Sequence, residues 1–260
     1  MLRSTAGKYP SDKRLTWALG GKSHANVTLG HVVFAPPRVS LASRNLIELL
    51  LMRLLPFLAL GLLASTPVRA DYLAMISRLA PKLNPAVIAE AVTAMECAQR
   101  NGVGEKASRL AIIDYTIPSR NKRLWVVDLA SGKLLFREHV AHGKGSGGDI
   151  PTVFSNSNGS HQTSLGLFLT DRTYQGGNGY SLKLHGLSKG YNESAMERLI
   201  VMHGAGYVNP ASAQALGRLG RSLGCPAVRR EVAKPMIDTL KRGQFIYAYG
   251  PGTGKLSECK

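Results

Sequence analysis

Hydrophobic positions follow a helical period in the first part of the chain that is predicted to fold, residues 71–105. Apolar residues recur every three or four positions at Val87, Ala91, Met95 and Ala98. Asn84 and Pro85 supply an N-cap and a first-turn proline, and Gly102 supplies a stop signal. The pattern predicts an N-terminal helical extension over residues 71–105.

After residue 105 the pattern changes to short runs that are rich in β-branched and aromatic residues. Such runs are "RLAIIDYTI", "RLWVVDLA", "KLLFREHVAHG", "TSLGLFLT", "YSLKLHGL", "RLIVMHGAGYV" and "QFIYAYG". Ser131 and Gly132 lie between the second and third runs and are typical of a turn, so these two runs are expected to form a hairpin. One later segment, "REVAKPMIDTLKRG", is helical and is expected to end at Gly243. The spacing predicts a β-rich α+β domain over residues 106–255, with a mixed or antiparallel sheet.

Residues 52–70, "MRLLPFLALGLLASTPVRA", have the layout of a secretory signal peptide. A short positive start precedes an apolar run, and Val68 and Ala70 are small residues just before Asp71. The run is far shorter than the roughly 20 residues that a membrane span needs. A buried amphipathic helix is the alternative, which the absence of a polar face disfavours. We expect export to the periplasm or cell envelope, with no stable membrane span after cleavage.

Residues 1–51 do not fit a signal peptide that begins at Met52. They are rich in Gly, Pro and Ser and show no sustained periodicity. We expect them to be a non-native or disordered leader, with translation starting at Met52.

Charge narrows the choice of partners. The whole chain carries a formal charge of +17. Cleavage after Ala70 would remove nine Lys/Arg and two Asp/Glu, and would leave +10. Outside the cytoplasm this favours anionic envelope polymers, and a solvated basic surface without a partner is an equal alternative. No nucleic-acid-binding motif is present, so no nucleic-acid partner is expected. "GKGSGG" lacks the spacing of a phosphate-binding loop.

Two residues could carry covalent catalysis. His203 ends an apolar run and is followed by Gly204, and Cys225 follows Gly224 in the turn-prone "GRLGRSLGCP". A cysteine nucleophile needs a base, an orienter for that base and oxyanion donors. Taken alone, a histidine more often has a structural role than that of a base, and a lone cysteine is among the most commonly buried residue types.

The segments "VMHGAGYVNP" and "GRLGRSLGCPAV" closely resemble the murein L,D-transpeptidase catalytic domain family (YkuD-type). The likeness covers about residues 84–251. The family pattern is a His, a spacer of some 14 to 17 residues, and then Ser/Thr-His-Gly-Cys. Here 18 residues separate His203 from Ser222, and Leu223 stands where the family has its second His.

The resemblance implies a mixed β-sheet sandwich and an exported cysteine enzyme that acts on peptidoglycan stem peptides without a cofactor. Cys225 would form a thioester with the third stem residue, usually diaminopimelate, and release D-Ala. An amine acceptor would then give a 3–3 cross-link. His203 would be the base, oriented by a backbone carbonyl near Gly204.

Supporting roles are expected close to the nucleophile. Gly224 and Ser222 would support the turn and the oxyanion, together with Gly204. Arg218 and Arg221 would bind stem carboxylates or favour the thiolate, or would be plain solvated charge.

The two other cysteines, Cys97 and Cys259, are expected to form a disulfide, or else to be two free thiols. No metal is expected. The alternative zinc set of His139 and His142 with His161 or His185 lacks ligands at the usual spacing.

Three functions therefore stay open. The first is an L,D-transpeptidase, and the second is an L,D-carboxypeptidase that uses water as the acceptor. The third is a non-catalytic murein-binding protein on the same scaffold. It remains an alternative because Leu223 stands where the family pattern has its second histidine.

Overall fold

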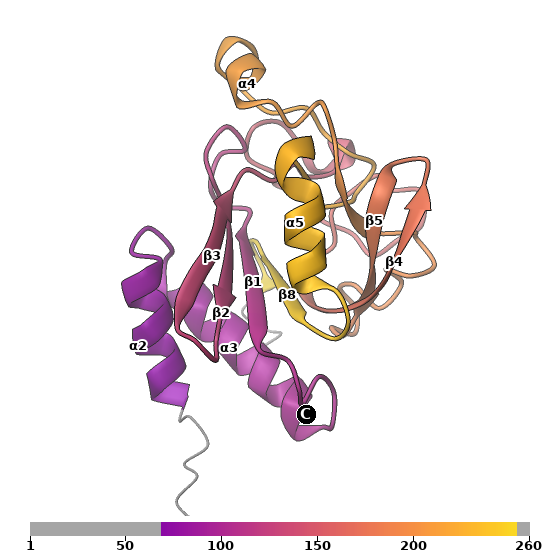
Figure 1. Cartoon of the computed structure of the whole chain (residues 1–260). Coiled ribbons are helices and arrows are strands. Elements are labelled where there is room, and N and C mark those ends of the chain that lie inside the picture. Colours follow the sequence, from indigo (N-terminus) through magenta and orange to yellow (C-terminus); the bar gives the residue numbers. More distant parts are fainter. Residues whose placement is uncertain (1–68, 254–260) are drawn as a thin grey trace, which may run out of the picture. The chain divides into compact units, whose positions relative to one another are not determined.

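The computed structural model describes residues 69–253 of the chain (Figure 1). The predicted leader, residues 52–68 of the predicted signal peptide, and Cys259 lie outside the described residues. The predicted cleavage point between Ala70 and Asp71 falls in the first turn of helix α2 (Arg69–Leu79). None of the helices between residues 69 and 253 combines the length and the apolar character that a membrane crossing requires.

The predicted helical extension is present as α2 and a longer helix, α3 (Pro85–Arg100). Asn84 caps α3, because its side-chain oxygen accepts a hydrogen bond from the Ala86 N–H at 2.9 Å. Proline at the first helical position has no N–H that would need a partner there. The cap and the start of α3 are as the sequence predicts.

Eight strands form one mixed sheet, in the order β3-β2-β1-β8-β4-β5-β6-β7. The β1–β8 and β6–β7 pairs are parallel and the others are antiparallel. This confirms the predicted β-rich α+β class and its mixed sheet. The strands are β1 (Arg109–Asp114), β2 (Leu124–Asp128), β3 (Lys133–Glu138), β4 (Gly166–Gly176), β5 (Gly179–Gly186), β6 (Val201–Gly204), β7 (Ala227–Val228) and β8 (Phe245–Tyr249).

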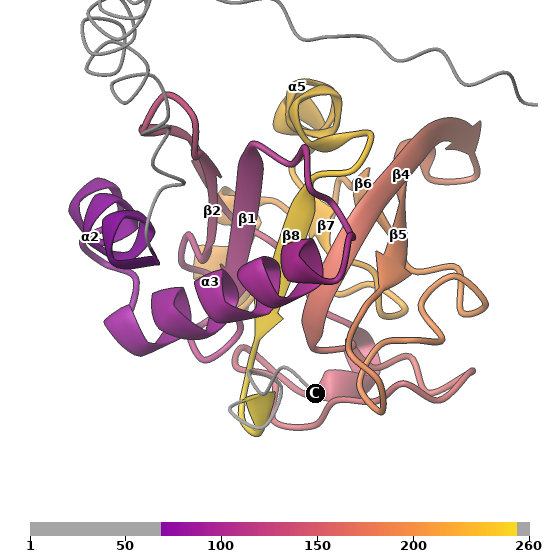
Figure 2. The same ribbon diagram turned by 90° about the horizontal axis from the view of Figure 1, so that it is seen from below.

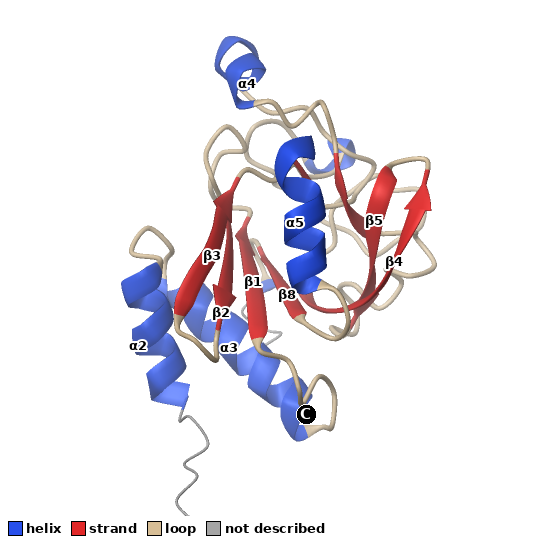
Figure 3. Cartoon of the chain, in the orientation of Figure 1, coloured by secondary structure: helices blue, strands red, loops and turns tan. Residues whose placement is uncertain are grey.

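Helices cover both faces of the β1–β2–β8 part of the sheet (Figure 3). The side chains of β1 point alternately to these two faces. Ala111 and Ile113 join one buried cluster, which also contains residues of helix α5 (Arg230–Leu240). Leu110 and Ile112 join a second cluster with residues of α2 and α3. Successive strand residues point to opposite faces, so one strand serves two cores. Figure 2 shows α3 crossing the strands on the side away from α5.

Three details differ from the sequence prediction. A short helix, α4 (Pro210–Leu216), was not predicted, although Asn209 caps it as Asn84 caps α3. Its seven residues are too few to show a hydrophobic period. Helix α5 ends at Leu240 rather than at Gly243, because Lys241 is already extended. The strand that contains His203 spans only four residues, Val201–Gly204, and ends one residue after the histidine.

Candidate active site

The cysteine lies in a tight turn that enters β7. Ser222 organises this turn, because its hydroxyl donates to the Cys225 carbonyl oxygen at 2.6 Å and accepts from the Gly224 N–H at 3.1 Å. Gly224 has φ +125°, a conformation that favours glycine. The turn support that the sequence assigns to Ser222 and Gly224 is therefore seen in the backbone. The Gly224 N–H is already used inside the turn, which leaves it no proton for an oxyanion.

A second segment, residues 141–144, runs beside the turn and holds it in place. The Ser222 N–H donates to the His142 carbonyl at 2.9 Å, and the Lys144 N–H donates to the Ser222 carbonyl at 2.8 Å. The two chains approach closely at Gly143, where an added Cβ would lie 2.9 Å from the Gly224 Cα. Only glycine allows this approach without a shift of the cysteine turn.

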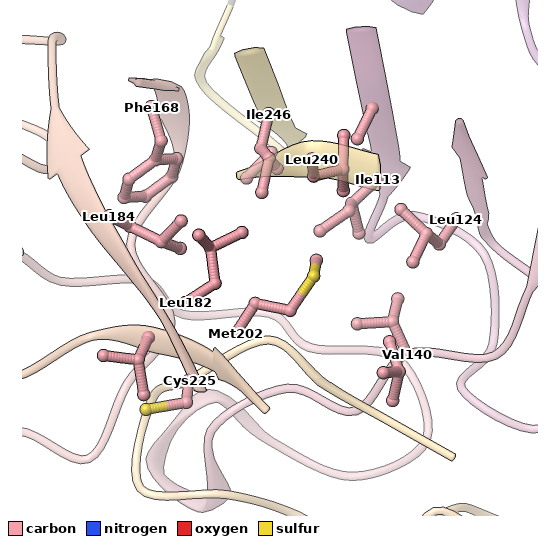
Figure 4. Close-up of a cluster of buried hydrophobic side chains, with 14 of the residues drawn as sticks. Ile113, Leu124, Val140, Phe168, Leu182, Leu184, Met202, Cys225, Leu240 and Ile246 are labelled. Carbon is pink, nitrogen blue, oxygen red and sulfur yellow. The ribbon is translucent and has the colours of Figure 1, made fainter. Parts of the chain in front are cut away.

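The thiol of Cys225 is free and is 9% exposed, at the edge of the hydrophobic cluster drawn in Figure 4. Its Sγ donates a weak hydrogen bond to the Leu199 carbonyl at 3.6 Å. Burial raises the pKa of the thiol, and the Val201 N–H and the Arg198 guanidinium act in the opposite direction. The thiol is thus protonated at rest, with groups beside it that favour the thiolate.

Arg198 is the cation beside the thiol, and sequence reasoning missed it. Its guanidinium donates to the Gln162 carbonyl at 2.8 Å and to the Ser155 carbonyl at 2.6 Å, and also contacts the Ser160 and Ser164 hydroxyls. Burial lowers its pKa, and the thiolate form of Cys225 acts to raise it. One half-buried arginine therefore fixes the 155–164 loop and places positive charge near Cys225. A lone arginine in "MERLIVMHG" gave no signal of this.

His203 is 4% exposed and is oriented by its own strand. Its Nδ1 lies 3.1 Å from the Gly204 carbonyl oxygen, which is the backbone contact that the resemblance implies. Burial lowers the pKa of His203, so the ring is neutral at pH 7. A neutral ring that donates from Nδ1 leaves Nε2 as an acceptor, the form that a general base needs.

The two predicted catalytic residues belong to neighbouring parts of the sheet edge. His203 pairs with Ala227, two residues after Cys225, and the thiol lies near the Val201 N–H, two residues before His203. Two strand residues span about 7 Å. Thiol and imidazole share this edge, and they are not hydrogen-bonded to each other here.

A comparison with protein-family models identifies the family of the chain. The family model of the L,D-transpeptidase catalytic domain matches residues 79–249. The chain belongs to this family. Among curated proteins, none matches it significantly.

Solved structures of L,D-transpeptidases resemble the chain only distantly. The enzyme from Stackebrandtia nassauensis is 16% identical over 71% of this chain and 79% of that one, with a TM-score of 0.34. That from Mycobacterium smegmatis is 15% identical over 55% and 59%, also at 0.34. LdtMt1 in complex with imipenem is 14% identical over 55% and 59%, at 0.34. The chain thus spans about three fifths of the length of the last two.

Leu223 stands where the family pattern given by the resemblance has its second histidine. Its side chain is 59% exposed, in the turn that Ser222 organises. Leu223 therefore places an apolar side chain at the surface next to Cys225.

The arginines predicted to bind substrate lie beside the turn and have backbone partners. Arg221 donates to the Gly147 carbonyl at 2.6 Å, and Arg218 donates to the Leu219 carbonyl at 3.1 Å. Arg221 thereby ties the loop around Gly147 to the cysteine turn. Carboxylate binding by either side chain stays a prediction.

The buried guanidinium of Arg123 holds the segment that lies beside the cysteine turn. Arg123 is fully buried and donates to the Val140 and Ile117 carbonyls, and its Nη2 lies 2.7 Å from His142 Nδ1. Burial, followed by the Arg123 charge, lowers the pKa of His142 to about 4. His142 is therefore a neutral acceptor for Arg123. Their hydrogen bond fixes the segment that borders the cysteine turn.

The remaining candidate residues are the histidines of the alternative zinc set and the two other cysteines. His139 lies near the Arg120 carbonyl at 3.1 Å, and His185 pairs with Asp171 at 3.2 Å, so the alternative zinc residues have other partners. Within residues 69–253, no group of three or more His, Cys, Asp or Glu side chains could hold a metal ion. Cys97 is disulfide-bonded. Because Cys259 is not among the residues described, the Cys97–Cys259 pairing stays a prediction.

Proposed function

We propose that this protein is an exported peptidoglycan L,D-transpeptidase with Cys225 as its nucleophile and His203 as its general base. The observation that carries the proposal is the position of the free thiol against β6, the strand that orients His203 through the Gly204 carbonyl. Family membership supplies the substrate class, the peptidoglycan stem peptides.

The acylation half of the reaction follows from this arrangement. Substrate entry turns the thiol from the Leu199 carbonyl toward Nε2 of His203, which takes its proton. The thiolate attacks the carbonyl of the third stem residue, and the C–N bond to D-Ala breaks. His203 then returns the proton to the leaving amine, and a thioester to Cys225 remains.

The deacylation half reverses these roles. An amine of a second stem loses a proton to His203 and attacks the thioester carbonyl, which forms the 3–3 cross-link. The Cys225 sulfur leaves and regains its proton from His203. Because one imidazole serves as base and then as acid, its pKa must stay near or below neutrality, as burial ensures.

Charge in the site supports the thiolate and the tetrahedral intermediate. Arg198 and the Val201 N–H lower the pKa of the buried thiol against the effect of desolvation. The Gly224 N–H is held by Ser222, so we assign the oxyanion to the Cys225 N–H, which interacts with the thiol.

Export is supported by the sequence of residues 52–70 and by the basic charge that remains after the predicted cleavage. LdtMt1, to which the chain is distantly similar, was solved with imipenem. A carbapenem is therefore a suitable covalent probe of Cys225 in this protein.

Water as the acceptor is the second candidate, since the exposed Leu223 beside the thiol gives no donor or acceptor for an incoming amine. Incubation of the protein with purified tetrapeptide muropeptides distinguishes the candidates by mass spectrometry. A transpeptidase yields cross-linked dimers and a carboxypeptidase yields tripeptide monomers. Binding without either product would indicate a non-catalytic murein-binding protein, and products that persist in Cys225→Ala would exclude the nucleophile.

A further inference from the structure

A second concave site lies on the face of the sheet that α2 and α3 cover, away from Cys225. It is a groove of about 480 Å³, within the usual size range of small-molecule sites. The eight residues that line it come from the α2–α3 turn, the β1–β2 loop, and strands β2 and β3 with the residue that follows. They are Lys82, Ile117, Arg120, Asn121, Lys122, Trp125, Arg137 and His139, which we call the tryptophan groove.

Two ring nitrogens in the tryptophan groove are buried without a hydrogen-bond partner. Nε1 of Trp125 and Nδ1 of His139 have this property, and their residues are 1% and 8% exposed. Buried polar groups in folded proteins almost always have a partner. The indole N–H is only a donor, so the partner that fits it is an acceptor on a ligand.

The charge of the tryptophan groove has one sign. Four of its lining residues are Lys or Arg and none is Asp or Glu. Arg120 pairs with Asp149 at 2.6 Å, and Lys122 lies 3.8 Å from Glu138. Lys82 and Arg137 are exposed and have no carboxylate partner in the part of the chain that the structure describes. These two side chains therefore carry the excess positive charge.

Strand pairing brings the cation and the indole donor together. Trp125 on β2 is the direct cross-strand partner of Arg137 on β3, so their side chains share a face. Lys82 reaches the same groove from the turn between α2 and α3. A guanidinium, an ammonium and an indole N–H converge here, and this set of donors suits an oxyanion.

We propose that the tryptophan groove binds an oxyanion, a phosphate or carboxylate group carried by a larger ligand, at a site distinct from the catalytic turn. Arg137 and Lys82 supply the charge, and the indole N–H of Trp125 supplies the directed hydrogen bond. The volume of the groove leaves room for the sugar or peptide unit to which the anion is attached. The site would hold an anionic polymer while Cys225 acts elsewhere on the protein.

The indole resonance of Trp125 reports on this site directly. The 15N-labelled full chain is titrated with glycerol 3-phosphate in one arm and glucuronate in the other, against sodium chloride at equal ionic strength. Trp17→Phe assigns the Trp125 cross-peak, since the chain has two tryptophans. We expect a saturable downfield shift of that cross-peak, and the arm with the tighter Kd identifies phosphate or carboxylate as the source.

Matched variants distinguish anion binding in the tryptophan groove from a general effect of the positive charge of the protein. Arg137→Gln with Lys82→Gln should weaken the Kd at least about tenfold, since both charge-assisted contacts are lost. Arg172→Gln, an exposed arginine on β4, and Cys225→Ala should leave the Kd unchanged. A shift no larger than that with chloride in both arms would overturn the proposal, as would equal binding by the double variant.

Discussion

The hydroxyl of Ser222 joins the two ends of the cysteine turn, because it donates to the Cys225 carbonyl at 2.6 Å and accepts from the Gly224 N–H. Loss of this hydroxyl leaves a buried N–H and a buried carbonyl without a partner. Ser222→Ala should therefore lower the free energy of unfolding by about 1–3 kcal/mol, measured by urea denaturation. Ser212→Ala, at an exposed position on α4, is the control and should change it little. Equal stability of Ser222→Ala and the native chain would show that the turn does not depend on this hydroxyl.

Arg198 should control the reactivity of Cys225. Replacement by Gln removes the positive charge that lowers the pKa of the thiol, so the pKa should rise and alkylation by iodoacetamide at pH 7.5 should slow severalfold. Arg198→Lys keeps the charge and should restore much of the rate. The measurement is the alkylation rate against pH for folded protein. A profile of Arg198→Gln that overlies the native one would limit Arg198 to holding the 155–164 loop.

Close packing at Gly143 makes a steric prediction. A methyl group there would press on the Gly224 Cα and on the backbone of His161. Gly143→Ala should destabilise the fold by about 1–3 kcal/mol and reduce the acylation rate of Cys225. Gly148→Ala is the matched control, because a Cβ there meets no atom within 4 Å. A native acylation rate in Gly143→Ala would mean that segment 141–144 does not position the nucleophile.

Stability should fall as the pH falls below 6.5. The pKa of His142 is about 4 in the folded protein against 6.5 in its ordinary state, so the unfolded chain binds more protons between these values. Stability is full above pH 6.5 and is lost as the pH falls toward 4, by roughly 3 kcal/mol for this group. Burial lowers the pKa of His203 and His139 in the same direction.

His142→Asn should flatten this pH dependence, because asparagine can accept from Arg123 and does not titrate. The measurement is the free energy of unfolding between pH 4 and pH 7. If the variant and the native chain lose stability in parallel, the lowered pKa of His142 is not the source of the pH dependence.

Sequence patterns predicted the elements that depend on local signals. Asn84 and Pro85 fix the start of α3, and runs rich in β-branched and aromatic residues predicted the longer strands. Helix α4 has the same Asn-Pro start at Asn209, but its hydrophobic repeat is too short to recognise. Strand β7 has only two residues, and its pairing with β6 is a tertiary contact.

The candidate site was predictable only where local sequence determines it. The family resemblance implied that a backbone carbonyl near Gly204 orients the imidazole, and Gly204 directly follows His203 in the chain. Arg198 becomes important through the distant loop that contains Gln162, and no local pattern shows that contact. Arg218 and Arg221 are near Cys225 in sequence, yet their hydrogen bonds go to backbone carbonyls. Proximity in sequence was a poor guide to which cation affects the thiol.

Covalent modification by a carbapenem tests the central claim, that Cys225 is the nucleophile and His203 its base. Intact mass spectrometry of the full chain should show one carbapenem adduct on the native protein and none on Cys225→Ala. His203→Gln should acylate far more slowly while its unfolding midpoint shows that it remains folded. An adduct that persists in Cys225→Ala would contradict the account.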